Sequence, residues 1–223
     1  MQSSSDRKTI MIARRIFAGE TAKEDGKYGS KNEPFTGKID YYGIHGDVTN
    51  AQFELSNAHI TWIDGTWHDG VWEYGTWRNG HWEDGTWKIG SWDDGLWSGG
   101  TWEYGHWQNG IWRPLEGKKN VWQDGTWKNG IWHSGVHVNG WWEKGIWKAG
   151  KWENGTFWGG TWEDGTFNGG VNWYGIFKGG VWNDGKWYYS ATWEGGTWNG
   201  GIDEDDDFHG KGATPDKWKK DDK

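Results

Sequence analysis

The chain has 223 residues, of which 26 are Trp and 40 are Gly, and it contains no Cys. Leu, Ile, Val and Phe together make up only 30 residues, so the core must be built from Trp, whose indole carries about 150–250 Å² of buriable surface. The net charge of −8 argues against a nucleic-acid-binding groove lined by Lys and Arg, and the lack of Cys excludes disulfides and thiolate ligands.

Residues 1–34 are expected to form a polar, basic N-terminal arm. They hold seven Lys or Arg residues and end in a Gly-Ser-Lys-Asn-Glu-Pro stretch that is typical of a linker. The apolar stretch Ile10-Met11-Ile12 is interrupted by Arg14 and Arg15, so nothing has the length of a signal peptide or a membrane span. We therefore expect a soluble protein without membrane contact.

Residues 35–61 are expected to form an N-terminal capping coil. The segment contains Ala51-Gln52-Phe53-Glu54-Leu55 and Ala58-His59-Ile60, in which a small residue begins each short unit and an apolar residue follows two positions later. These units lead directly into the Trp-rich region, so the segment is predicted to close one end of it.

Residues 62–202 form an internal repeat of five residues. Between Trp62 and Trp187 an aromatic slot recurs every fifth residue, and 20 of its 26 positions are Trp. The unit is Gly-x-Trp-x-x. A period of five fits neither a helix, with 3.6 residues per turn, nor a continuous strand, with a period of two. It indicates very short strands separated by turns at fixed intervals.

Two all-β architectures fit this repeat: an antiparallel β-meander with a ten-residue unit, and a right-handed, four-sided parallel β-solenoid with about 20 residues per coil. Two patterns favour twenty. Aspartates recur in one twenty-residue phase, and most departures from Trp in the aromatic slot fall in another: Asp64, Asp84, Asp124, Asp164, Asp184; Gly117, His137, Phe157, Phe177. We predict the four-sided solenoid, with about seven coils and Trp62, Trp82 and Trp102 stacked in one column.

The repeat unit and the segment Ala51–Leu55 resemble the pentapeptide-repeat family, with Trp in place of Leu and Gly in place of Ala. The resemblance implies a four-sided β-solenoid. Runs such as Trp127-Lys128-Asn129-Gly130 are more weakly similar to MORN repeats. Arrays of Trp-Gly pentapeptides also resemble uncharacterised phage structural proteins, which implies a virion as a location.

Residues 203–223 are expected to form a charged, disordered C-terminal tail. The tail begins with five consecutive acidic residues, Asp203 to Asp207, and ends in a mixture of Lys and Asp. Charge blocks of this kind usually remain solvated.

No catalytic site is predicted. The sequence lacks the motifs of a nucleophile, a phosphate-binding loop and a zinc protease, and its His residues are not spaced as metal ligands. His137 occupies an inward slot, where packing is its expected role. We therefore expect no enzyme activity, no cofactor and no metal.

Binding is expected where the repeat is broken. Trp141, Trp158 and Trp173 lie outside the inward slot and should project outward, where aromatic side chains often mark binding surfaces. Together with Arg14 and Arg15 of the arm they are the candidate partner-binding residues. Further irregularities are the segment Arg113–Asn120 and a one-residue slip at Tyr188-Tyr189.

These features favour a non-enzymatic structural or interaction protein: a rigid rod, attached by its arm to protein partners in a larger assembly such as a phage virion, with a homo-oligomer as one arrangement. One alternative, implied by the family resemblance, is an acidic rod that mimics DNA and acts on a topoisomerase. The other is a carbohydrate-binding rod that uses its outward Trp residues.

Overall fold

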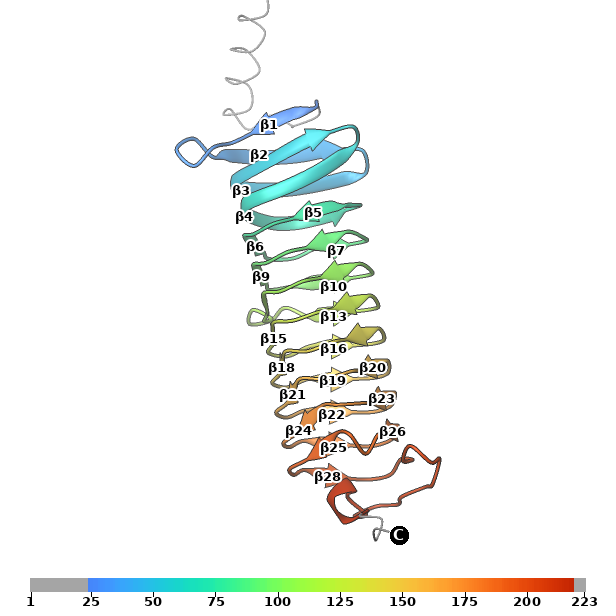
Figure 1. Ribbon diagram of the computed structural model, residues 1–223. Helices are drawn as coiled ribbons and strands as arrows, with labels where there is room; N and C mark the ends of the chain where they lie inside the picture. The colour runs from blue at the N-terminus through green and yellow to red at the C-terminus, as the bar shows by residue number, and fades with distance from the viewer. Residues whose placement is uncertain (1–23, 219–223) are drawn as a thin grey trace, which may run out of the picture.

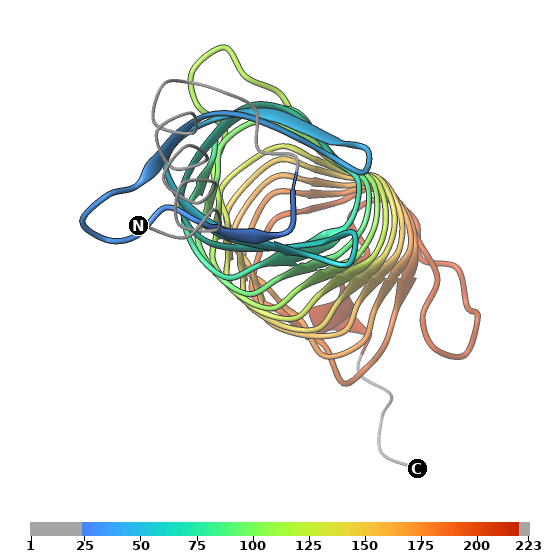
Figure 2. The ribbon, with the colours of Figure 1, turned by 90° about the horizontal axis from the view of Figure 1, so that it is seen from above.

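The protein is an all-β rod of coils stacked along one axis, as the computed structural model of residues 24–218 shows (Figure 1). Each coil has three short strands joined by corners at glycine, and Figure 2 shows the coils superimposed around a common axis. The strands of successive coils pair in parallel over about nine coils. The predicted β-solenoid is therefore confirmed, but it has three sides.

Four strands, β1 to β4, form the N-terminal end. The first coil of the solenoid is part of β4. Strand β4 contributes one segment to each of the three faces. The bounds are β1 (Gly26–Tyr28), β2 (Phe35–Tyr41), β3 (Ile44–Ser56) and β4 (His59–Trp72).

Every third strand then belongs to the same face. Face 1 contains β5 (Gly75–Trp77), β8 (Ser91–Trp92), β11 (His106–Trp107), β14 (Thr126–Trp127), β17 (Trp141–Trp142), β20 (Thr156–Phe157), β23 (Val171–Asn172) and β26 (Lys186–Trp187). Face 2 contains β6 (His81–Trp82), β9 (Leu96–Trp97), β12 (Ile111–Trp112), β15 (Ile131–Trp132), β18 (Ile146–Trp147), β21 (Thr161–Trp162), β24 (Ile176–Phe177) and β27 (Thr192–Trp193). Face 3 contains β7 (Thr86–Trp87), β10 (Gly100–Trp102), β13 (Asn120–Trp122), β16 (Val136–His137), β19 (Lys151–Trp152), β22 (Thr166–Phe167), β25 (Val181–Trp182) and β28 (Thr197–Trp198).

The coil contains fifteen residues, so the predicted coil of twenty is wrong. Trp77 pairs with Trp92 in register, fifteen residues later. The predicted column of Trp62, Trp82 and Trp102 does not exist, because these residues lie on faces 1, 2 and 3. At about 4.8 Å per coil, nine coils give a rod about 40 Å long.

The aspartate pattern misled the prediction because it reflects the corners and not the faces. In Asp84, Asp124 and Asp164 one carboxylate oxygen accepts a hydrogen bond from the N–H of the following glycine, at 2.6–2.8 Å. Any corner of any face can use this interaction. The twenty-residue recurrence of Asp therefore carries no information about which strands pair.

The core consists of three columns of stacked aromatic rings, one for each face. Trp62 stacks on Trp77 with ring centroids 4.7 Å apart and planes inclined by 9°. Within a coil, Trp77 meets Trp82 edge to face at 5.9 Å. Both geometries are favourable for rings that have a negative face and a positive edge. Each inner indole is thus held by neighbours in its own coil and in the adjacent coils.

The indole N–H groups are the main cost of this core. Most inner Trp residues of the described chain, Trp62 to Trp147 among them, have an Nε1 without a hydrogen-bond acceptor. A buried donor left unsatisfied costs about 1–3 kcal/mol. Edge-to-face and stacked ring pairs contribute about 0.5–1.5 kcal/mol each beyond burial, and every inner ring makes several.

The corners depend on glycine. Gly125 has a φ of +119°, and a Cβ at this position would lie 2.4 Å from the carbonyl oxygen of Gly105 in the coil before. Both the backbone conformation and the close approach therefore exclude a side chain. The positive φ falls on the glycine, whereas the residues before it, such as Ile89 and Lys144, do not have one.

One pentapeptide is looped out of the stack between Arg113 and Asn120. Trp102 pairs with Trp122, twenty residues later, and the two following pairings across the insertion also span twenty, whereas Trp87 pairs with Trp102 at a spacing of fifteen. The extra residues leave the outline of the coils, in light green in Figure 2, and Lys118 forms an ion pair with Asp84. This insertion preserved the five-residue count and so concealed the fifteen-residue period.

The N-terminal end is closed by antiparallel strands and not by the predicted capping coil. β3 pairs antiparallel with β1, β2 and β4, and the segment Ala51–Ile60 turns back on itself at Asn57 and Ala58, both of which have positive φ. Strand β1 lies within the expected arm, and its Tyr28 is buried against Phe53. Pairing of this kind covers the open edge of the first coil, which limits stacking with other molecules.

Candidate functional site

The three outward Trp residues predicted from the sequence lie together on face 1. Trp158 and Trp173 directly follow the inward residues of β20 and β23, and Tyr188 follows that of β26 in the same way. Trp141 is the outward residue of β17, one coil before Trp158. The fifteen-residue coil places these side chains in consecutive layers of one face.

Their rings form a continuous row. Trp141 and Trp158 have ring centroids 5.4 Å apart, Trp158 and Trp173 are also 5.4 Å apart, and Trp173 stacks on Tyr188 at 3.6 Å. Tyr174 meets the ring of Trp158 edge-on at 4.9 Å. We refer to Trp141, Trp158, Trp173, Tyr174 and Tyr188 as the aromatic strip.

The aromatic strip is accessible to solvent. Trp141 is 40% exposed, Trp158 37% and Tyr174 50%, while Trp173 and Tyr188 are half-buried by their neighbours. The equivalent positions in the coils from β5 to β17 carry polar or charged residues: Arg78, Asp93, Gln108, Lys128 and Glu143. A contiguous exposed apolar patch on an otherwise polar surface marks an interaction site.

Ring orientation limits what the aromatic strip can bind. Trp173 stacks on Tyr188 with planes inclined by 16° and is tilted by 38° against Trp158, so the faces that these rings turn toward one another are covered. A platform for stacking sugar rings needs open faces. A row of packed indole and phenol rings instead suits the apolar side chains of a protein segment.

Trp141 differs because it lines a shallow depression. Tyr104, Asp124, Asn139 and Trp141 line this depression, together with the small residues of the adjacent corners. Asn139 donates a hydrogen bond from Nδ2 to Asp124 Oδ2 at 3.1 Å. The depression therefore combines an exposed ring with a fixed pair of planar polar groups.

An acidic loop borders the other end of the aromatic strip. Lys186 lies 5.6 Å from the ring centre of Tyr188 and forms an ion pair with Asp206 at 2.7 Å. The exposed residues Glu204 to Asp207 follow in the same loop, and the backbone N–H of Tyr189 donates to Glu204. The strip thus runs from a polar depression to a concentration of negative charge.

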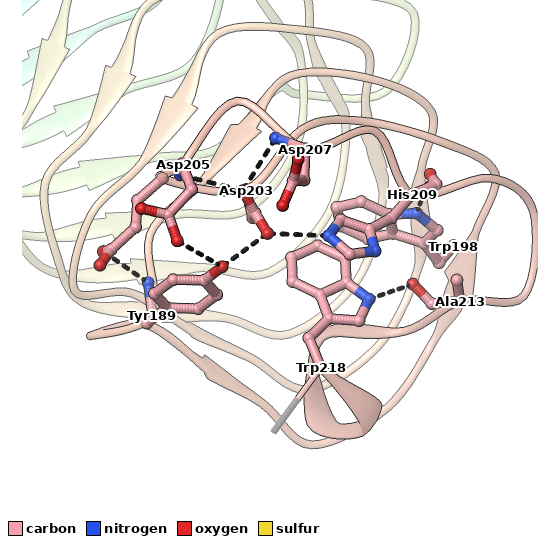
Figure 3. A network of polar contacts seen from close by, with 9 residues as sticks. Tyr189, Trp198, Asp203, Asp205, Asp207, His209, Ala213 and Trp218 are labelled. Carbon is pink, nitrogen blue, oxygen red and sulfur yellow. Dashed lines mark hydrogen bonds and ion pairs between the residues drawn. The ribbon is translucent and has the colours of Figure 1, made fainter. Parts of the chain in front are cut away.

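The acidic segment is ordered around Asp203, so the predicted disordered tail is wrong for residues 203–218. Asp203 is 2% exposed and accepts hydrogen bonds from the hydroxyl of Tyr189 at 2.5 Å and from the backbone N–H groups of Asp205 and Asp207 (Figure 3). Its Oδ2 also lies 2.9 Å from His209 Nε2. Burial alone would raise the pKa of Asp203, but hydrogen bonds from His209, Tyr189 and the amides outweigh it and lower the pKa to about 2.

Trp218 closes the C-terminal end of the core. Its ring meets Trp198, the last indole of the face 3 column, edge-on at 4.9 Å and stacks on His209 at 3.8 Å. Its Nε1 donates to the carbonyl oxygen of Ala213 at 2.8 Å (Figure 3).

The one-residue slip at Tyr188-Tyr189 does not interrupt strand pairing, since Trp182 still pairs with Trp198.

A Ser-His-Glu arrangement on face 2 has the residue types of a hydrolase but not the access. Ser98 Oγ lies 2.8 Å from His81 Nε2, and His81 Nδ1 lies 3.8 Å from Glu83 Oε1. Ser98 is 0% exposed, so its hydroxyl cannot reach a substrate in this arrangement. Across residues 24–218 no group of three or more His, Asp or Glu side chains is placed to hold a metal ion.

Three residues of this surface are predictable from the sequence. Trp141, Trp158 and Trp173 were identified, and Asn172 rather than Trp173 occupies the inward slot, where it is 2% exposed. Arg14 and Arg15 lie outside the described residues. Tyr174 and Tyr188 were missed. The fifteen-residue spacing of Trp158, Trp173 and Tyr188 would have revealed both the strip and the coil length.

Comparison of the chain with protein-family models, with curated proteins and with solved structures gave no significant match. The chain is a parallel β-solenoid of regularly spaced Trp repeats. The part of the chain that the structure describes contains no helix long and apolar enough to cross a membrane.

Proposed function

We propose that the protein is a non-enzymatic interaction rod that binds a protein partner through the aromatic strip and belongs to a larger assembly. The observation that carries this proposal is the row of exposed rings on face 1, where the equivalent positions from Arg78 to Glu143 are polar or charged. Aromatic residues, and Trp in particular, dominate the binding energy of protein interfaces. A phage virion is the assembly that the sequence resemblance favours.

The solenoid suits a structural role because it holds the strip rigidly. Backbone hydrogen bonds link each coil to the next: the N–H of Trp158 donates to the carbonyl of Trp142 at 2.7 Å, and that of Thr156 to the carbonyl of Gly140 at 2.8 Å. The side chains of the strip are therefore fixed before binding, which reduces the entropy lost when a partner docks.

The DNA-mimic alternative is less well supported by the fifteen-residue coil. Mimicry needs a continuous negative stripe, but Glu83, Glu103 and Glu143 lie on faces 2, 3 and 1. Carbohydrate binding is favoured only at Trp141, which lines the shallow depression together with Asp124 and Asn139.

A pull-down from the native source tests the proposal. The full chain should retain a protein partner that a Trp158→Ala/Trp173→Ala variant loses. Ile89→Ala is the matched control, since Ile89 is 47% exposed but lies on face 3, away from the strip. Equal retention by all three proteins would contradict the proposal, whereas retention of a polysaccharide that depends on Trp141 would favour the carbohydrate alternative.

A further inference from the structure

We propose that residues 7–17 of the chain fold back along face 1 and dock on the aromatic strip of the same molecule. This intramolecular contact goes beyond the proposed function, and it does not depend on the identity of any partner. In the free protein it would cover the strip that a partner must reach.

The described chain begins next to the first rings of the face 1 column. Strand β1 pairs with β3, and Tyr28 stacks on Phe53 at 4.9 Å. Phe53 in turn stacks on Trp62, the first indole of the face 1 column. The described chain therefore begins at the N-terminal end of face 1, the same face that carries the aromatic strip.

The chain before residue 24 is long enough to reach the aromatic strip. At about 4.8 Å per coil, Trp141 lies about 30 Å and Tyr188 about 43 Å along face 1 from Phe53. An extended chain advances about 3.3 Å per residue, so Arg14 reaches about 33 Å from residue 24 and Arg7 about 56 Å. An extended segment 7–17 thus spans the whole strip and ends beside the acidic loop.

The segment and the strip are chemically complementary. The segment contains Arg7, Lys8, Arg14 and Arg15 without an acidic residue, together with the apolar side chains Ile10, Met11, Ile12, Ile16 and Phe17. The strip offers exposed aromatic rings for the apolar side chains. At its far end, Glu204 to Asp207 offer negative charge at the distance that Arg7 and Lys8 reach.

Docking of the segment on its own chain is favoured over docking of the segment of a second copy, because the tether raises its local concentration. A tether that spans two sites gives an effective concentration of about millimolar, well above that of the protein in solution. A weak contact between the segment and the strip is therefore sufficient for docking.

Disulfide trapping in this cysteine-free chain tests the proposal. An Ala13→Cys/Lys144→Cys protein places one thiol in the segment and one on face 1 beside Trp142, at matching distances along the rod. Lys148→Cys replaces Lys144→Cys in the control, since Lys148 lies in the same coil but on face 2. Under mild oxidation we expect the face 1 pair to form an intramolecular disulfide at least tenfold faster than the control pair.

Two further variants separate docking from random collision. Trp158→Ala/Trp173→Ala and Arg7→Glu/Lys8→Glu, each in the face 1 cysteine background, should reduce the rate to that of the control, with circular dichroism unchanged. Equal rates for the two cysteine pairs, rates unaffected by these variants, or disulfides found only between chains on a non-reducing gel would overturn the proposal.

Discussion

Trp107 stacks on Trp127 with ring centroids 4.7 Å apart, nearly the same spacing as the 4.8 Å between Trp92 and Trp107. The first pair is separated by twenty residues and the second by fifteen. The stack is therefore continuous through the insertion, and the extra pentapeptide lies outside it.

This continuity predicts that the insertion is dispensable. Replacing Pro114–Asn120 by Asp-Gly restores a fifteen-residue coil and removes the Lys118–Asp84 ion pair, which is exposed and screened by solvent and so contributes little to stability. We expect a folded protein whose melting temperature, followed by circular dichroism, changes by a few degrees at most. Loss of cooperative unfolding would show that the loop is part of the fold.

Core and surface positions next to each other should respond very differently to substitution. Trp102 is 0% exposed, so Trp102→Ala should cost about 3–5 kcal/mol in the free energy of unfolding, the range for deletion of a large buried ring. Glu103 points outward, and Glu103→Gln should cost less than about 0.5 kcal/mol. Denaturant titration measures both, and similar losses would contradict the assignment of inward and outward positions.

Substitution of two glycines with positive φ should distinguish the cost of backbone strain from the cost of steric overlap between coils. Gly117 in the loop has a φ of +78° with no atom within 4 Å of an added Cβ, so Gly117→Ala should cost about 1 kcal/mol from backbone strain alone. Gly125→Ala adds a contact of 2.4 Å with backbone and should cost several times more. Chemical denaturation compares the two, and equal costs would mean that the coils can move apart.

His137 should make the rod sensitive to acid. Burial, partly offset by backbone groups of Asn154 and of His137 itself, lowers the pKa of this side chain from 6.5 to about 3. The unfolded chain therefore binds a proton below about pH 6.5 that the folded protein does not bind, so stability falls as pH decreases from 6.5 toward 3, by up to about 1.4 kcal/mol per pH unit.

His137→Phe should remove this component, since Phe167 already occupies an equivalent inward slot on face 3. Urea titrations of both proteins at pH 7.5 and 4.5 are the measurement. The free energy of unfolding of the variant minus that of the unsubstituted protein should be about 2–3 kcal/mol larger at pH 4.5 than at pH 7.5. A difference independent of pH would contradict a neutral, buried His137.

Local features of this fold could be predicted from the sequence, whereas pairing could not. The five-residue unit fixes the inward position of Trp and the corner position of Gly, and both predictions are confirmed at Trp102 and Gly125. The number of sides depends on which strands pair across coils. Asp124 interacts with the next residue along the chain and carries no such information.

The candidate site shows the same division. The outward placement of Trp158 follows from its position after an inward slot. Its contact with Trp173 depends on the coil length and was not predicted. The ordered C-terminal segment was also missed, because the charge of Asp203 favours solvation until Tyr189 and His209 are brought to it by the last coils.

Core, aromatic strip and loop all depend on a coil of fifteen residues, and one pair of cysteine variants tests this directly. Thr86 and Thr101 are register partners on face 3, whereas His106 pairs with Ser91 on face 1. Cα atoms of paired strands lie within the range of about 4.4–6.8 Å that a disulfide spans. Thr86→Cys/Thr101→Cys should therefore oxidise readily to an intramolecular disulfide, and Thr86→Cys/His106→Cys should not. A disulfide in the second protein and none in the first would contradict the three-sided coil and with it the aromatic strip.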